Sequence, residues 1–99
     1  MRLTSAQRDQ IQRTVADLAG GDAVVRLFGS RAIDSARGGD VDLLVELPQA
    51  IASPAMLAAR IGARISRAMG GRKVDVLLSA PNLQESEIHR VAREQGIAL

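Results

Sequence analysis

Apolar residues follow two spacings along this chain, one typical of helices and one typical of strands. Near the N-terminus they recur every three or four positions, at Ile11, Val15 and Leu18. That spacing predicts an amphipathic helix, which Thr4 or Ser5 can cap and which a pair of glycines ends. One face of this helix should pack against the rest of the chain.

Two further segments show helical spacing. The first covers 53–71, where a Ser-Pro pair typical of a helix start is followed by apolar residues and then by two glycines. Its apolar residues mark one face: Met56, Leu57, Ile61, Ile65 and Met69. The second covers 82–94, where Asn82 and Glu85 form a capping-box pattern. Both segments are predicted to be helices.

Short apolar runs rich in β-branched residues lie between these helices and predict strands. Three such runs cover 22–28, 40–46 and 73–78, and the last residues, 97–99, could add a short edge strand. A short helical turn is expected over 31–33, between the first two strands. The predicted order is therefore α-β-α-β-α-β-α.

Alternating helices and strands predict an α/β (α+β) fold, formed by one domain over residues 1–99. A chain of this length holds one domain at most, and it shows no internal repeat and no linker. Three or four strands with so few helices cannot be covered on both faces, so the helices should lie on one face. The other face should stay open as a cleft, where a site can be built.

The composition excludes several classes of protein. Among the 99 residues there is no cysteine, which rules out disulfides, thiolate zinc sites and thiol catalysis. Phe28 is the only aromatic residue, and thirteen scattered cationic residues face eleven acidic ones, so direct binding of nucleic acid is not expected. The N-terminal residues lack the apolar core of a signal peptide, and no apolar run is long enough to span a bilayer, so we expect a cytoplasmic protein without membrane contact.

Two acidic residues open the second predicted strand. Because side chains alternate along a strand, Asp40 and Asp42 point to one face while Val41 points to the other. Their Cα atoms lie about 6.6 Å apart, so the carboxylates can share two metal ions spaced about 3.5–4 Å. The alternative is that Asp40 caps the preceding turn and Asp42 faces solvent.

A third acidic residue, Asp75, lies inside the apolar run 73–78. A buried carboxylate without a partner is costly, so Asp75 must face a cation, a metal ion or solvent, the last on an exposed edge strand. Three gathered carboxylates repel one another unless cations intervene, and two Mg²⁺ ions beside a triphosphate would offset their charge. Oxygen ligands without His or Cys nearby favour Mg²⁺ or Mn²⁺ over zinc.

Gly29 and Ser30 form a candidate seat for phosphate groups. They follow a predicted strand and open a helical turn, which leaves backbone N–H groups and a positive dipole end facing an incoming anion. The glycine permits close approach, and the serine hydroxyl adds a hydrogen-bond donor. Arg31 either contacts the phosphates as well or is a surface residue.

Three segments, in this order, resemble the DNA polymerase β-like nucleotidyltransferase superfamily. They are Leu-Phe-Gly-Ser-Arg-Ala at 27–32, Gly-Asp-Val-Asp-Leu-Leu-Val at 39–45 and Val-Asp-Val-Leu at 74–77. Within it they look most like the minimal nucleotidyltransferases that pair with HEPN-domain toxins. The resemblance covers nearly the whole chain and implies a small mixed β-sheet.

The resemblance implies two-metal transfer of a nucleoside monophosphate, AMP from ATP or another nucleotide, onto a hydroxyl. Asp40 and Asp42 would bind the ions that clamp the triphosphate, and Asp75 would help hold the ion that activates the hydroxyl. Gly29 and Ser30 would hold the phosphates. The implied acceptor is a tyrosine of a HEPN-type toxin, so the chain would be an antitoxin that forms a homo- or hetero-oligomer.

Two departures from the family pattern lie near the phosphates. Members usually carry a second glycine after the Gly-Ser pair, where this chain has Ile33 and Asp34, and the segment from Ser30 to Asp40 is one residue shorter than usual. These changes bear on nucleotide choice and rate. The alternative function is an antitoxin with a decayed site that neutralises its partner by complex formation. Nucleotidylation of a small molecule comes third, because it usually needs an extra helical domain.

Several other residues carry weaker signals. His89, the single histidine, is expected to be a partly exposed helix residue rather than a general base. Met56 and Met69 are expected to fill the core. Three arginines repeat at helical spacing, which indicates a solvated face or a face that binds a partner: Arg60, Arg64 and Arg67.

Overall fold

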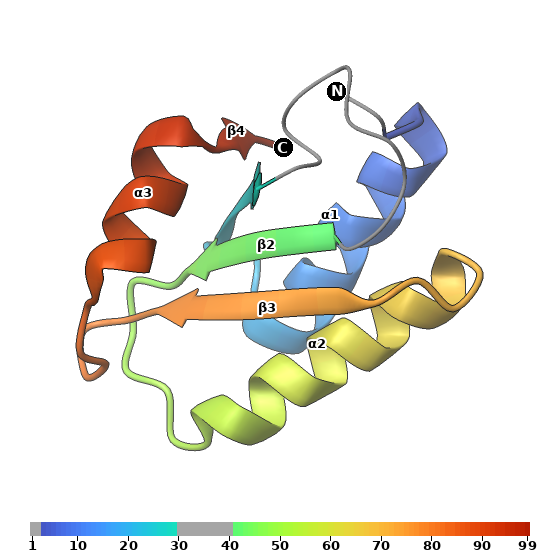
Figure 1. Cartoon of the computed structure of the whole chain (residues 1–99). Helices are drawn as coiled ribbons and strands as arrows, with labels where there is room; N and C mark the ends of the chain where they lie inside the picture. Colours follow the sequence, from blue (N-terminus) through green and yellow to red (C-terminus); the bar gives the residue numbers. More distant parts are fainter. Residues whose placement is uncertain (1–2, 30–40) are drawn as a thin grey trace.

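A computed structural model describes residues 3–29 and 41–99 of the chain (Figure 1). In chain order its elements are α1 (Ser5–Ala19), β1 (Val24–Phe28), β2 (Val41–Glu46), α2 (Pro54–Ala68), β3 (Val74–Ser79), α3 (Glu87–Gln95) and β4 (Ile97–Ala98). These follow the predicted order of helices and strands. The predicted helical turn over 31–33 and the neighbouring Asp34 lie outside the described residues.

The two long helices begin where their capping signals predict. The Thr4 hydroxyl accepts a hydrogen bond from the Gln7 N–H at 3.0 Å, and the Gln7 side chain accepts from the Thr4 N–H at 2.9 Å. This reciprocal pair is a capping box and begins α1. Ser53 precedes α2, with Pro54 at its first position. No helix in the part of the chain described has the length and apolar character needed to cross a bilayer.

The strands form one mixed sheet in the order β3-β2-β1-β4. β1 pairs antiparallel with both β2 and β4, whereas β2 pairs parallel with β3. A parallel pair needs a crossover connection, and α2 supplies it between β2 and β3. The predicted small mixed sheet of three to four strands is confirmed, and it agrees with the polymerase β-like fold that the resemblance implies.

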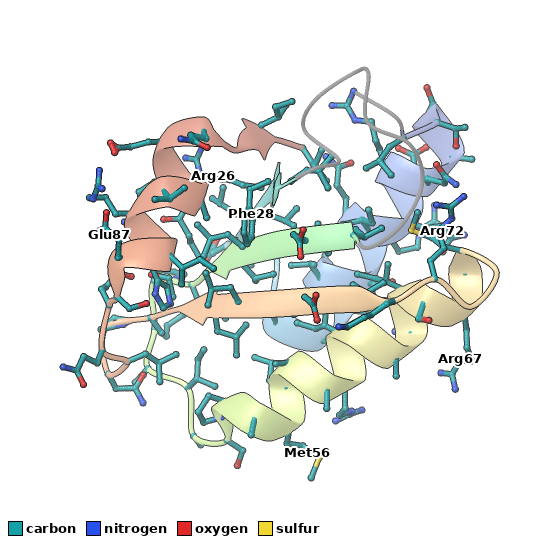
Figure 2. All side chains as sticks on the ribbon, viewed as in Figure 1. Arg26, Phe28, Met56, Arg67, Arg72 and Glu87 are labelled. Atoms are coloured by element: carbon teal, nitrogen blue, oxygen red, sulfur yellow. The ribbon has the colours of Figure 1, made fainter. Side chains whose placement is uncertain are left out.

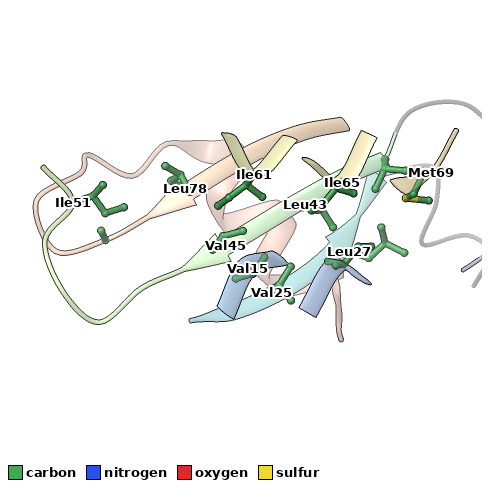
Figure 3. Close-up of a cluster of buried hydrophobic side chains, with 13 residues drawn as sticks. Val15, Val25, Leu27, Leu43, Val45, Ile51, Ile61, Ile65, Met69 and Leu78 are labelled. Carbon is green, nitrogen blue, oxygen red and sulfur yellow. The ribbon is translucent and has the colours of Figure 1, made fainter. Parts of the chain in front are cut away.

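One face of the sheet is covered by α1 and α2, which lie side by side behind it in Figure 1. Alternate residues of the strands point into this layer, and Figure 3 shows the aliphatic cluster that results. Its members include Ile11, Val15, Val25, Leu27, Val41, Leu43, Val45, Ile61, Ile65, Met69 and Leu78. Burial of this apolar surface holds the helices against the sheet.

The opposite face of the sheet is only partly covered. By alternation it carries Asp42, Leu44 and Glu46 of β2, paired in register with Asp75, Leu77 and Ser79 of β3. α3 packs over one end of this face, where Arg93 donates to Glu46 at 2.8 Å and to the Ser79 hydroxyl at 3.3 Å. Asp42 and Asp75 lie at the other end of the same strands.

The predicted capping role of Asn82 is wrong. Its side chain accepts from the Ile51 N–H at 2.9 Å and donates to the Ile51 carbonyl at 2.8 Å. These two bonds join the loop after β3 to the loop before α2, and α3 begins five residues later, at Glu87. The Asn82 side chain therefore makes two partly buried long-range hydrogen bonds and does not cap a helix.

Only one of the two predicted core methionines is in the core. Met69 is 7% exposed and packs in the aliphatic cluster, as predicted. Met56 is 62% exposed, which corrects the prediction for that residue. It lies in the first turn of α2, on the side of the helix opposite to the buried Ile61 and Ile65.

Candidate functional site

Asp42 and Asp75 are direct neighbours on two adjacent strands. β2 and β3 run parallel in a register that pairs Asp42 with Asp75. Paired strands lie about 4.8 Å apart, and their side chains alternate in step, so both carboxylates project from the same face. It is the face that α1 and α2 leave open. The structure therefore brings together two of the three acidic residues that the sequence singled out.

Gly29 lies against the Asp42 carboxylate. It follows β1, whose last residue, Phe28, pairs with Asp42 in the antiparallel ladder. Its φ is +74°, in the left-handed region that favours glycine. A Cβ built on Gly29 would overlap an Asp42 carboxylate oxygen and lie 3.1 Å from Asp42 Cγ. Glycine is therefore needed here for its backbone conformation and for clearance of the carboxylate, a second reason that the sequence does not reveal.

Three predicted site residues, Ser30, Arg31 and Asp40, lie outside the described residues. Each adjoins a described part of the site, because Ser30 follows Gly29 and Asp40 precedes the first residue of β2. Within the part of the chain that the structure describes, no three His, Asp or Glu side chains gather closely enough to hold a metal ion. The described part of the site thus consists of Gly29 and two carboxylates.

Comparison with protein families gives the family of the whole chain. The family model described as nucleotidyltransferase domain matches residues 8–95, which include Gly29, Asp42 and Asp75. This chain belongs to the nucleotidyltransferase domain family. Nucleotidyl transfer is accordingly its general class of activity. Comparison with curated proteins and with solved structures finds no match.

The carboxylates of this nucleotidyltransferase suit a hard divalent cation. Asp42 and Asp75 present oxygen donors side by side at a partly open sheet face, and Mg²⁺ and Mn²⁺ prefer oxygen ligands with several retained waters. Zinc prefers nitrogen or sulfur, but the chain has no cysteine, and its only histidine, His89, is hydrogen-bonded elsewhere. The donor set therefore fits magnesium or manganese.

A network of polar side chains ties α3 to the strand ends on the same face. It consists of Arg26, Glu46, Ser79, Glu85 and Arg93, and we call it the Arg93 network. Hydrogen bonds from Arg93 and from the Ser79 hydroxyl lower the pKa of Glu85 to about 2. Partial burial raises the pKa of Glu46, but hydrogen bonds and charges of Arg93 and Arg26 outweigh it and lower that pKa overall. The network holds α3 over one end of the face.

We predict that the Arg93 network weakens in acid. Both glutamates have folded-state pKa values below the ordinary 4.5, so their contribution to the free energy of unfolding is fully present above about pH 4.5. It is lost as the pH falls from there through the folded pKa, which is about 2 for Glu85. Urea denaturation between about pH 7 and pH 3 should show this loss.

Glu46→Gln should be less stable than the wild type at neutral pH and should lose less stability on acidification. Glu87→Gln is the matched control, because Glu87 is an exposed glutamate of α3 outside the network. A Glu46→Gln protein whose stability falls with pH as steeply as that of the wild type would contradict this role of the network.

His89 is buried, at 7% exposed, which corrects the expectation of a partly exposed helix residue. Its Nδ1 accepts from the Ser86 backbone N–H at 3.1 Å, and its Nε2 lies 2.9 Å from the Leu78 carbonyl oxygen. Because a carbonyl only accepts, Nε2 carries the proton, and both ring nitrogens are engaged. His89 therefore joins the start of α3 to the last residues of β3. With both ring nitrogens hydrogen-bonded inside the fold, it is not a general base. The signal in the sequence is Ser86, three residues earlier, as in a capping box.

We predict that His89→Ala lowers the free energy of unfolding by about 2 kcal/mol, because the Leu78 carbonyl and the Ser86 N–H each lose a partner. Ile88→Ala changes the preceding residue of α3, which is 53% exposed. It should cost less than about 0.5 kcal/mol in the same urea denaturation. Equal losses in the two variants would speak against a structural role for the imidazole.

Proposed function

We propose that this nucleotidyltransferase moves AMP from ATP to a hydroxyl group of a partner protein, with residues 1–99 acting as one catalytic domain. One observation carries most of the weight. The register of β2 and β3 pairs Asp42 with Asp75, and Gly29 lies against Asp42. A phosphate seat next to paired carboxylates is the arrangement that two-metal nucleotidyl transfer requires.

In the proposed reaction the acceptor oxygen attacks the α-phosphorus of ATP. The bond from that phosphorus to the bridging oxygen breaks, pyrophosphate leaves in line, and the hydroxyl proton is lost to solvent. Gly29 and Ser30 hold the phosphates, with Arg31 contacting them as well. Because Gly29 has no side chain, a phosphate can approach the backbone N–H groups that follow β1.

Two Mg²⁺ ions, with Mn²⁺ as a substitute, are the cofactor that we propose. Asp40, Asp42 and Asp75 would hold them through carboxylate oxygens. When bound, the ions offset the negative charge that develops on the entering and leaving oxygens. Asp75 is the more exposed of the two described carboxylates. We therefore place the ion that it holds on the side from which the acceptor hydroxyl enters. Asp40 is included on the sequence pattern, as the same-face neighbour of Asp42 along β2.

We further propose that the acceptor is a tyrosine of a HEPN-type toxin and that this chain is its antitoxin. Within the described residues, α3 covers only one end of the sheet face, so a partner can reach the end that holds Asp42 and Asp75. The resemblance of the three sequence segments to the minimal nucleotidyltransferases supports this choice of partner. The two proteins would form a hetero-oligomer.

The test is transfer of label to the partner. The purified chain is mixed with the protein that the neighbouring gene encodes, with Mg²⁺ and with ATP labelled at the α-phosphate. We expect Mg²⁺-dependent label on a tyrosine of the partner and none when Asp75→Asn replaces the wild type. Parallel reactions with the other labelled nucleotides establish the base preference. No label from any nucleotide would contradict the proposal.

The same proteins separate transfer from neutralisation by complex formation. An antitoxin with a decayed site, acting only as a binding module, would neutralise the toxin equally well as the Asp75→Asn variant. If Asp75→Asn still forms the complex but no longer neutralises, the binding-module alternative is excluded. No described residue favours that alternative, because the altered loop around Asp34 lies outside them.

A further inference from the structure

The three helices differ in the charge they carry. α2 contains three arginines and no acidic residue, whereas α1 and α3 each contain as many acidic residues as arginines. The formal charge of the whole chain is only +2, so α2 alone exceeds it. Solvated protein surfaces usually carry positive and negative residues side by side. The purely positive charge of α2 therefore needs an explanation.

The arginines of α2 share one side of the helix with two apolar residues. We call this set the α2 stripe, and its members are Met56, Arg60, Ala63, Arg64 and Arg67. At about 100° per residue, these five positions fall within roughly 100° of the helix circumference. All five are exposed, and the buried positions of α2 lie on its other side: Ile61, Gly62 and Ile65. Figure 2 shows Met56 and Arg67 projecting away from the sheet on the same side of α2.

Two of the three arginines have no ion-pair partner within the part of the chain that the structure describes. Arg64 donates to Asp17 of α1 at 2.9 Å, and both side chains remain about half exposed. Arg60 and Arg67 contact no acidic side chain among residues 3–29 and 41–99. Arg67 lies in the last turn of α2, where a cation is favoured by the helix dipole. That explanation does not apply to Arg60, which lies in the middle of the helix.

A shallow groove of about 220 Å³ runs along the α2 stripe where it meets α1. It is lined by Leu18, Arg60, Ala63, Arg64 and Arg67. Leu18 and Ala63 offer apolar surface between the guanidinium groups. The groove can therefore take an aliphatic side chain while carboxylates on either side of that chain meet the arginines.

We propose that the α2 stripe is a docking surface for an acidic helix of a partner protein. Carboxylates at positions i, i+4 and i+7 of such a helix match the spacing of Arg60, Arg64 and Arg67. The planar guanidinium group of arginine can form two parallel hydrogen bonds to a carboxylate. Arg64 already donates one hydrogen bond to the carboxylate of Asp17. Arginine and methionine are both enriched in protein interfaces, so the exposed Met56 fits the same use.

An acidic protein fits the α2 stripe better than nucleic acid does. Arg60 and Arg67 are about 10 Å apart along the helix, which is short for a track along a phosphate backbone. The stripe has no aromatic side chain on which a base could stack. The exposed Met56 adds an apolar contact. This contact suits a protein partner, which can bury apolar side chains against it.

Docking on the α2 stripe is separate from the proposed transfer. α2 packs on the face of the sheet that buries Leu43, whereas Asp42, the preceding residue, points to the other face. A partner bound to α2 would therefore leave the paired carboxylates accessible. Either proposal can fail without the other.

The test measures binding of a synthetic helical peptide that carries glutamates at i, i+4 and i+7 around a leucine. The full chain is titrated with this peptide and with a matched peptide in which glutamines replace the glutamates. Arg60→Glu/Arg67→Glu reverses two charges of the stripe. The control, Arg8→Glu/Arg13→Glu, reverses two exposed charges on α1 and changes the net charge equally.

We expect the Arg60→Glu/Arg67→Glu variant to bind the acidic peptide about tenfold or more weakly, and the control variant to bind within about twofold of wild type. Met56→Ser should weaken binding by a smaller factor, and the glutamine peptide should bind poorly to every variant. Equal weakening in both double variants, or no binding of the acidic peptide, would overturn the proposal. So would tighter binding of a single-stranded RNA of about 20 nucleotides at physiological salt.

Discussion

Asp42→Asn and Asp75→Asn should each lower the rate of nucleotidyl transfer by about a thousandfold. Each change removes a negative charge and one oxygen ligand from the pair that the register of β2 and β3 brings together. The amide that replaces it is a weaker ligand for Mg²⁺, so the charge on the reacting phosphate would be offset less. The measurement is the initial rate of AMP incorporation into the partner protein at saturating ATP and Mg²⁺.

Asp75→Asn, which changes an exposed carboxylate, should keep the stability of the wild type or exceed it. Without a bound cation, neighbouring carboxylates raise each other's energy, so replacing one of them relieves repulsion. Thermal unfolding without metal therefore separates a functional role from a structural one. Glu87→Gln, an exposed carboxylate on α3, is the control and should leave the rate unchanged. If Asp42→Asn or Asp75→Asn transferred AMP at the wild-type rate, the paired carboxylates would have no part in the reaction.

Gly29→Ala should lower transfer by about a hundredfold while the chain still folds. The glycine has a φ of +74°, and its Cβ position is occupied by the Asp42 carboxylate. An alanine must move either the carboxylate or the backbone that follows β1, and both belong to the proposed site. A displacement of about 1 Å from the reactive geometry is enough for a loss of this size.

Gly70→Ala is a closely matched control for this change. Gly70 has almost the same conformation, with a φ of +73°, but a Cβ added there meets nothing within 4 Å. Both variants carry the strain of alanine in the left-handed region, about 1 kcal/mol, and should lose similar stability for that reason. Only Gly29→Ala should lose activity beyond what its stability explains. Similar activity in the two variants would show that the contact between Gly29 and Asp42 does not matter.

Much of the fold could be predicted because its signals are local. The capping box at Thr4, the Ser-Pro start of α2 and the glycines after both helices act within one turn of chain. The strands stand out as short β-branched runs between such signals. A small mixed sheet followed from the resemblance, and the structure confirms it.

The errors concern residues whose partners are distant in sequence. Asn82 looks like a helix cap, but its amide finds better partners in the backbone of Ile51, 31 residues away. His89 is buried, and the Leu78 carbonyl oxygen, near the end of β3, accepts a hydrogen bond from its Nε2–H. Met56 belongs to an apolar pattern in the sequence, yet it is 62% exposed and lies on the side of α2 opposite to Ile61 and Ile65. The long-range partners of Asn82 and His89 cannot be read from the residues around them.

The candidate site was predictable in its residue types but not in its geometry. The sequence indicates that Asp42 and Asp75 lie on strands, but not that those strands are adjacent, parallel and aligned at these two residues. A shift of one residue would put the two carboxylates on opposite faces. The contact between Gly29 and Asp42 is likewise a product of pairing between β1 and β2.

Binding of Mn²⁺ in the presence of a non-hydrolysable ATP analogue tests the central claim most directly, because it asks whether these carboxylates hold metal ions at all. The free ion can be followed by electron paramagnetic resonance as the chain is titrated. We predict about two ions bound per wild-type or Glu87→Gln chain beside the nucleotide, and at least one fewer in Asp42→Asn and in Asp75→Asn. Unchanged binding of Mn²⁺ in both aspartate variants would contradict a metal site built on Asp42 and Asp75.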